Sequence, residues 1–252
     1  MTTRHAAPNR PVALMLAMFL TGLGACSNQA RREPEPTFVT IADGLRLDRD
    51  RKIVEFDAVV PVDVHHPETP ITYLEVVCCV PGTHEHEALA MTEVAPSAIH
   101  AALLAVGAEP GLPGRWRWDG DRLVGDEPTG TAIEVFMVTD RGVESVRDWI
   151  VNIQNGRTLA QEPHDAPWIF GGSKTRQRDG RTLYDADYTG RLVGLTTFGD
   201  EVVGWGEMVS HEAMYDEPEW IANLDLVPPM GDPVRVRLRV LLPDDPTAGA
   251  PD

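Results

Sequence analysis

Imidazole and carboxylate groups, which suit metal binding and acid-base chemistry, are concentrated between His84 and His100. The run His84, Glu85, His86, Glu87 is predicted to be extended, which would place His84 and His86 on one face. Two imidazoles on one face could ligate zinc or copper, with His100 or Glu87 as a further ligand. Two surface histidines that form hydrogen bonds with carboxylates need no metal, so both interpretations stay open.

Two catalytic patterns do not fit the sequence. A zinc protease helix needs two histidines one turn apart in HExxH, but Ala88, Leu89 and Ala90 follow Glu87. A nucleophilic Ser173 would need glycines on both sides in GxSxG, and the segment GGSKT lacks the second one. We find no complete catalytic constellation, which favours a binding or assembly module over an enzyme.

The three cysteines limit metal and redox chemistry. Cys26 closes a lipobox-like segment, which leaves the adjacent pair Cys78 and Cys79. Iron–sulfur clusters usually need four thiolates, so a cluster held by this chain alone is disfavoured. Adjacent side chains in a strand point to opposite faces, so we expect one buried thiol and one exposed neighbour. A vicinal disulfide, and with it a redox accessory role, is the alternative.

The N-terminus has the features of an export signal. Arg4 and Arg10 precede the apolar run 12–20, which is too short to span a membrane. Leu23-Gly24-Ala25-Cys26 then resembles a lipobox, so we expect cleavage after residue 25 and a diacylglycerol on Cys26. The protein would be anchored to the bilayer outside the cytoplasm, and Ser27 favours the periplasmic face of the outer membrane in a cell with two membranes.

Composition limits the other partners. The chain carries a net charge of −17, and removing Arg4 and Arg10 with the signal changes it by −2, to −19. Such an acidic surface repels nucleic acid, so we expect no nucleic-acid partner. We expect a signal peptide at 1–25, a tether at 26–37, a single domain at 38–243 and a disordered tail at 244–252.

Several short motifs follow one another between about residues 40 and 205. They are His86-Glu87-Ala88-Leu89, Pro96, Ile99 to Leu104, Gly107, Pro110-Gly111 and Trp168 to Ser173. In this order and spacing they resemble the YdjY-domain family of bacterial envelope proteins. With the lipobox-like segment at Cys26, this chain would be a lipoprotein form of the domain, and the family has no assigned activity. It favours a functional patch formed by His86, Glu87, His100, Trp168 and Ser173.

The elements around these residues are predicted to be mainly strands. Pro96 suits a first helical turn and Gly107 a helix end, so one core-packed helix is expected at about 96–106. Most other apolar stretches alternate or are rich in β-branched residues, which predicts an α+β fold with a mainly antiparallel sheet. The expected strands are 52–60, 71–80, 131–138, 190–198 and 234–240, with a hairpin turn at Asp179-Gly180.

Two further patterns carry predictions. Arg235, Arg237 and Arg239 form one face of the last strand, where cross-strand pairing with carboxylates is favoured over anion binding. Trp116 and Trp118 would share a strand face, for which core packing is favoured over stacking on a sugar.

The resulting hypothesis is a lipid-anchored envelope protein that binds a protein or a small molecule. The alternatives are a metal-dependent enzyme that uses His84, His86, His100 and Glu87, and a redox accessory protein that uses Cys78 and Cys79.

Overall fold

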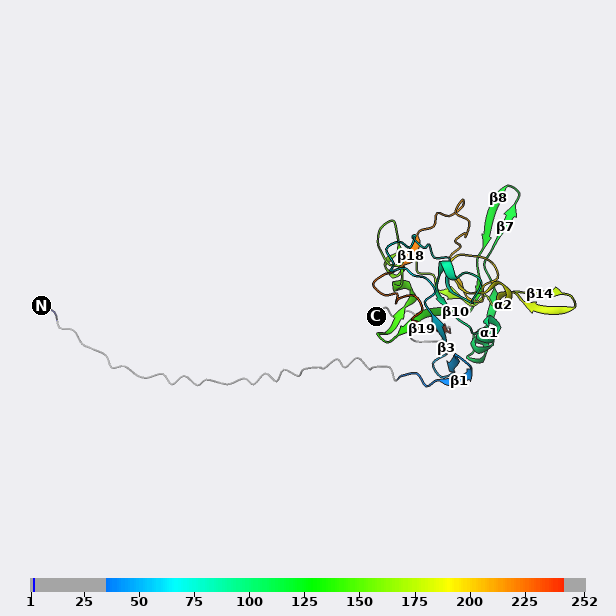
Figure 1. Cartoon of the computed structure of the whole chain (residues 1–252), viewed down its shortest axis with the longest axis horizontal. Helices are drawn as coiled ribbons and strands as arrows, with labels where there is room; N and C mark the ends of the chain where they lie inside the picture. The colour runs from blue at the N-terminus through cyan, green and yellow to red at the C-terminus, as the bar shows by residue number, and fades with distance from the viewer. Residues whose placement is uncertain (1, 3–34, 243–252) are drawn as a thin grey trace. The chain divides into compact units, whose positions relative to one another are not determined.

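The computed structural model describes residue 2 and residues 35–242 (Figure 1). The predictions for the signal, Cys26, most of the tether and the tail therefore fall outside the described residues. The described residues from Pro36 onward form one compact unit. Within the described part, no helix is long and apolar enough to cross a membrane.

A large β-sheet organises this unit. Its main path runs β16-β4-β5-β3-β19-β10-β13-β17, and β1, β2 and β11 pair with strands on that path or with each other. These strands are β1 (Val39–Ala42), β2 (Leu45–Asp48), β3 (Ile53–Val59), β4 (Val76–Cys79), β5 (Ala88–Met91), β10 (Ala132–Thr139), β11 (Gly142–Ser145), β13 (Trp168–Ile169), β16 (Arg191–Gly194), β17 (Gly204–Trp205) and β19 (Pro233–Leu241). Every pairing among them is antiparallel except β4 with β5, so the predicted α+β class is confirmed.

Among the described residues, shorter strands form four two-stranded sheets outside the large sheet, and short helical segments connect the strands. The paired ones are β6 (Pro110–Leu112) with β9 (Thr129–Gly130), β7 (Arg115–Asp119) with β8 (Arg122–Asp126), β12 (Ile150–Asn152) with β18 (Trp220–Ala222), and β14 (Thr175–Arg178) with β15 (Arg181–Tyr184). The helical segments are α1 (Pro96–Ala105), α2 (Asp185–Thr189) and the 3-10 turns Glu85–Glu87, Val146–Asp148 and Leu159–Gln161.

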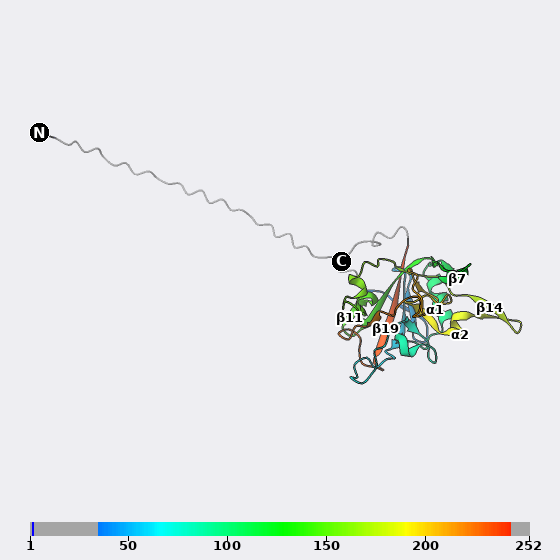
Figure 2. The ribbon, with the colours of Figure 1, turned by 90° about the horizontal axis from the view of Figure 1, so that it is seen from above.

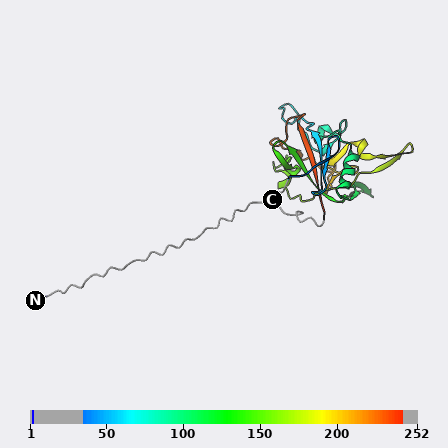
Figure 3. The same ribbon diagram turned by 90° about the horizontal axis from the view of Figure 1, so that it is seen from below.

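The centre of the sheet is β19 between β3 and β10, which Figure 3 shows as a red strand beside blue and green ones. Val234, Val236, Leu238 and Val240 alternate into the core, as the sequence predicts. On the outer face Arg235 and Arg237 pair with Glu55, which is only 1% exposed, and Arg239 pairs with Glu134. The predicted cross-strand pairing of the arginine row is therefore confirmed.

The predicted helix is confirmed as α1. Pro96 lies in its first turn, Ile99, Ala102 and Leu103 are buried, and Gly107 follows with a φ of 95°. The helix packs near β3 and next to α2, which Figure 2 labels beside it. Its burial against the sheet leaves His100 at the edge of the apolar stripe, half-buried.

Three predictions about local structure are wrong. Residues Glu85–Glu87 form a 3-10 turn rather than a strand. Cys78 and Cys79 do face opposite sides, but both are fully buried, because β4 lies inside the sheet and Val76, Ala88 and Phe198 cover the second face. Trp118 is 62% exposed on the β7–β8 hairpin instead of packing in the core, because that hairpin stands off the sheet.

Candidate functional site

His84 and Glu87 form the first part of the site. The Glu85 carboxylate accepts hydrogen bonds from the backbone N–H groups of Gly82 and Thr83, which folds the chain into the 3-10 turn. The backbone N–H of Glu85 itself, followed by these two bonds, lowers the pKa of the Glu85 carboxyl. The turn brings Nδ1 of His84 to 2.5 Å from Oε1 of Glu87. The turn also points the two histidines in different directions. As a result, the His86 side chain is 77% exposed and the His84 side chain is 16% exposed.

Arg191, the first residue of β16, completes this group. Its Nε donates to Nε2 of His84 over 3.0 Å, and one terminal nitrogen lies 3.0 Å from both carboxylate oxygens of Asp200. The guanidinium stacks 4.2 Å above the ring of Phe198. We call His84, Glu87, Arg191 and Asp200 the His84 cluster.

The cluster fixes the tautomer of His84. An arginine Nε–H can only donate, so Nε2 of His84 must be an acceptor. The proton then lies on Nδ1, where it is donated to Glu87. A His–carboxylate pair of this kind is the arrangement that orients a general base, but here Arg191 occupies the lone pair that a base would use.

Glu75 lies beside the cluster on the segment that leads into β4. Its backbone N–H donates to the Glu87 carbonyl over 3.1 Å. Burial, followed by repulsion from Glu87, raises the pKa of Glu75 to about 7, although Arg191 and His86 act in the opposite direction. Glu75 is therefore a carboxyl group that titrates near neutral pH.

His100 forms a second polar group with Tyr184. The Tyr184 hydroxyl donates to the Gly172 carbonyl over 3.0 Å, so it must accept from Nδ1 of His100, 2.8 Å away. The imidazole packs edge-on against Phe170, and burial lowers the pKa of His100. Burial also raises the pKa of Tyr184 above its usual range, so the phenol stays protonated.

Ser173 connects the two groups. Its hydroxyl donates to the backbone carbonyl of Asp200 and accepts from the Ala186 N–H over 3.1 Å. Its φ is 56°, in the left-handed region that non-glycine residues rarely adopt. The first bond holds the Gly172-Ser173 turn against the Asp200 turn and the second holds it against the start of α2, so Ser173 has a positioning role.

The residues of the predicted patch therefore do not form one surface. Glu87 joins His84, His86 points to solvent, and His100 and Ser173 belong to the Tyr184 side. Trp168 is 2% exposed and donates its indole N–H to the Gly194 carbonyl over 2.9 Å, which makes it a core residue.

Sequence reasoning missed Arg191, Asp200, Tyr184 and Glu75. The one available signal was Arg191, a charge at the start of the otherwise apolar run GRLVGL. The contact between Arg191 and His84 joins residues 107 positions apart, which no local pattern reveals.

The described residues show neither a preformed metal site nor an oxidised cysteine pair. Among the described residues no group of three or more His, Cys, Asp or Glu side chains is placed to hold a metal ion. Cys78 and Cys79 are both free thiols, so no vicinal disulfide is present in that region. Burial raises the pKa of Cys78 and raises that of Cys79 to about 11, which opposes thiolate chemistry.

Two hairpins rise beside this site. The bases of the β7–β8 and β14–β15 hairpins both lie against the turn at Gly199, just before Asp200. A Cβ atom added to Gly199 would be 3.2 Å from the Gly114 carbonyl oxygen, at the base of the first hairpin, and 3.4 Å from Nζ of Lys174, at the base of the second. Figure 1 shows both hairpins standing away from the sheet. On β7–β8 the exposed Trp118 contacts Tyr215 edge-on, with ring centroids 6.4 Å apart.

The comparisons with known proteins give one match. The family model of the YdjY domain matches residues 45–239, which include every motif residue on which the resemblance rests. No curated protein and no solved structure matches the chain. The match covers the strands and the helix that carry both polar groups.

Proposed function

Because this chain belongs to the YdjY-domain family, we propose that it is a lipid-anchored bacterial envelope protein whose domain acts as a binding or assembly module. The envelope location is proposed because the proteins of this family are described as envelope proteins. The aromatic surface at the β7–β8 hairpin is the observation that carries the binding role.

This surface consists of Trp118, Met214 and Tyr215. Their exposed fractions are 62%, 78% and 42%, and Trp118 and Tyr215 are in ring contact. Exposed Trp, Tyr and Met side chains that lie together are typical of protein interfaces, where they supply large contact areas at low entropic cost. The partner we propose is another envelope protein that presents an apolar patch.

Crosslinking in cells tests the binding role. A photoreactive amino acid at Trp118 should give a discrete higher-mass adduct after irradiation. The same amino acid at Ile71, which is 62% exposed elsewhere, is the matched control and should give none. Absence of an adduct at Trp118, or equal adducts at both positions, would contradict the proposal.

Fractionation tests the anchor separately. The lipobox-like Leu23–Cys26 motif supports acylation of Cys26, which would hold the domain at the membrane. Cys26→Ala, or inhibition of the lipoprotein signal peptidase by globomycin, should move the protein from the membrane to the soluble fraction or leave it unprocessed. The anchor proposal is wrong if neither treatment changes processing or location.

A metal-dependent enzyme is the second candidate, and its one supporting observation is that Glu75, whose pKa is about 7, lies beside the His84–Glu87 pair. Elemental analysis of the untagged chain tests it. If the protein contains a stoichiometric metal and the His84→Ala variant loses it, the metal-dependent enzyme becomes the preferred function. A metal-free wild-type protein would exclude this candidate.

A further inference from the structure

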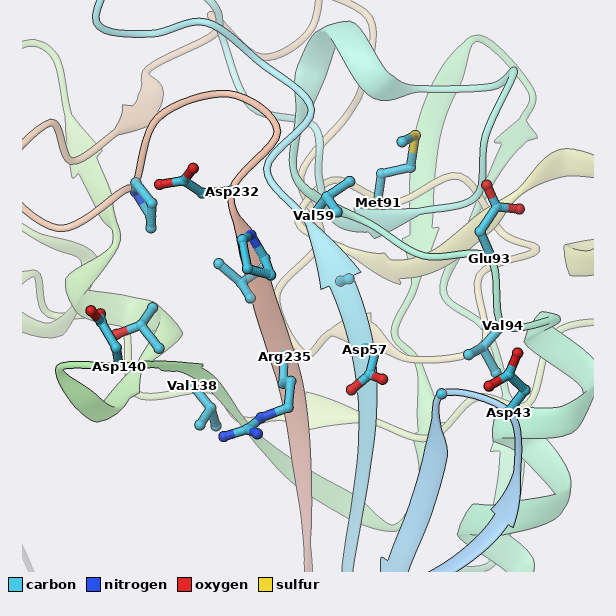
Figure 4. Close-up of a pocket in the computed structure, with 16 residues that line it drawn as sticks. Asp43, Asp57, Val59, Met91, Glu93, Val94, Val138, Asp140, Asp232 and Arg235 are labelled. Carbon is cyan, nitrogen blue, oxygen red and sulfur yellow. The ribbon is translucent and has the colours of Figure 1, made fainter.

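An acidic groove opens at one end of the central strands, and no residue of the two polar groups described above lines it. Its volume is about 1040 Å³, and it is lined at the end of β3, the start of β19, the end of β10 and the β1–β2 turn. Figure 4 shows its charged side chains. Five carboxylates line it, with Arg235 as the one lining cation, and they are Asp43, Asp57, Glu93, Asp140 and Asp232.

Few of these carboxylates are neutralised within the molecule. Asp57 lies 3.2 Å from Arg46, and Arg235 is itself engaged with Glu55 at 3.2 Å. The other four, Asp43, Glu93, Asp140 and Asp232, are exposed and have no cationic partner among the described residues. The groove is therefore a concave surface of concentrated negative charge.

The β14–β15 hairpin has the opposite charge. Between Lys174 and Tyr184 it carries four cations, Lys174, Arg176, Arg178 and Arg181, and one anion, Asp179. Every residue of β14 is exposed, and Figure 1 shows the hairpin projecting from the body. Arg176 pairs with Asp185 at 2.8 Å, whereas Arg178 lies 3.9 Å from Asp179, at the limit of an ion pair, and Arg181 has no ionic partner among the described residues. We call this hairpin the basic arm.

The basic arm is unusual for this chain, because the chain as a whole has a net charge of −17. Two copies therefore repel each other in most orientations. The orientation in which the arm of one copy approaches the groove of another is the attractive one, and such complementarity both steers encounter and selects the contact.

We propose that the tip of the basic arm, Arg178 to Arg181, docks into the acidic groove of a second copy of this chain. The two surfaces are different parts of the molecule, so the contact is head-to-tail and builds rings or open chains. This inference deepens the assembly role and rests on it, but it uses a different surface from Trp118.

Charge reversal in the full-length chain tests this contact. One variant reverses the arm with Arg178→Glu and Arg181→Glu, and a second reverses the groove with Glu93→Lys and Asp140→Lys. Sedimentation velocity in a nonionic detergent measures association at low and physiological salt. Wild type should form assemblies that dissociate as salt rises, and each reversed arginine should weaken association about tenfold.

Mixing the two variants separates this contact from a general charge effect. Each variant alone should be monomeric, whereas an equal mixture should associate again, because the acidic arm meets a basic groove and the basic arm meets an acidic groove. Arg122→Glu on the β7–β8 hairpin is the matched control and should behave as wild type.

Three results would overturn the proposal: a wild-type monomer at low salt, assembly that survives both reversals, or no recovery in the mixture. Binding of the monomer to vesicles of anionic phospholipid, lost on arm reversal, would instead identify lipid head groups as the ligand. None of these results changes the crosslink expected at Trp118, so failure of this contact can be distinguished from failure of the proposed binding role.

Discussion

Nε of Arg191 lies 3.0 Å from Nε2 of His84, and this contact determines how the whole cluster is organised. Arginine donates, so the imidazole accepts on Nε2 and donates to Glu87 through Nδ1. The same guanidinium holds Asp200, whose backbone carbonyl receives the Ser173 hydroxyl. One side chain from β16 thereby links the 3-10 turn to the turn that supports both hairpins.

Arg191→Ala should destabilise the fold by about 2 kcal/mol, because it leaves the half-buried Asp200 carboxylate and His84 without their donor. Urea unfolding of the full-length chain measures the change. The nitrogen shifts of His84 should also lose the signature of a single Nδ1–H tautomer. Arg122→Ala, at an exposed hairpin position, is the control and should stay within about 0.5 kcal/mol of wild type.

The pKa of Glu75 predicts a pH dependence of stability. Its pKa is about 7 in the folded chain and near the ordinary 4.5 in the unfolded chain, so the folded state binds more protons between these values. Its contribution to stability is therefore full below about pH 4.5 and is lost as the pH rises through 7. After discounting for partial exposure, the loss is about 2 kcal/mol.

Glu75→Gln mimics the protonated carboxyl, so it should raise the free energy of unfolding at pH 8 and flatten the profile between pH 4.5 and 7. Glu68→Gln, at an exposed loop position, should leave the profile unchanged. A wild-type profile that rises over this interval, or one that Glu75→Gln does not alter, would contradict the assigned pKa.

Elements with a strong local pattern were predictable. The alternation of Val234 to Val240 gave β19 with its arginine face, Pro96 and Gly107 gave α1, and Asp179-Gly180 gave the β14–β15 turn, where both residues have positive φ. In each case burial periodicity or backbone preference alone decides the structure.

The site was less predictable, because its contacts join distant segments. Cys79 is buried only because Ala88 and Phe198 cover the far face of β4, and Trp118 is exposed only because its hairpin leaves the sheet. His84 and His86 separate because the Glu85 carboxylate binds backbone N–H groups, which competes with an extended chain.

The burial of both strand cysteines predicts that they are unreactive. In a chain carrying Cys26→Ser, neither Cys78 nor Cys79 should react with a thiol reagent while the protein is folded, because both are 0% exposed and their pKa values are raised. Both should react in denaturant. Glu68→Cys in the same background supplies an exposed thiol that reacts at once, and native labelling of the strand pair at a similar rate would contradict the buried arrangement.

The hydroxyl of Tyr184 bridges Nδ1 of His100 and the Gly172 carbonyl, so Tyr184→Phe should remove two hydrogen bonds and leave a partly buried carbonyl without its donor. We expect a loss of about 1–3 kcal/mol in the free energy of unfolding, measured with urea at pH 7. Tyr188→Phe removes the same atom from a residue that is 66% exposed, and it should change stability by less than about 0.5 kcal/mol. If the two variants are equally stable, the Tyr184 hydroxyl does not hold α1 and the Gly172-Ser173 turn together.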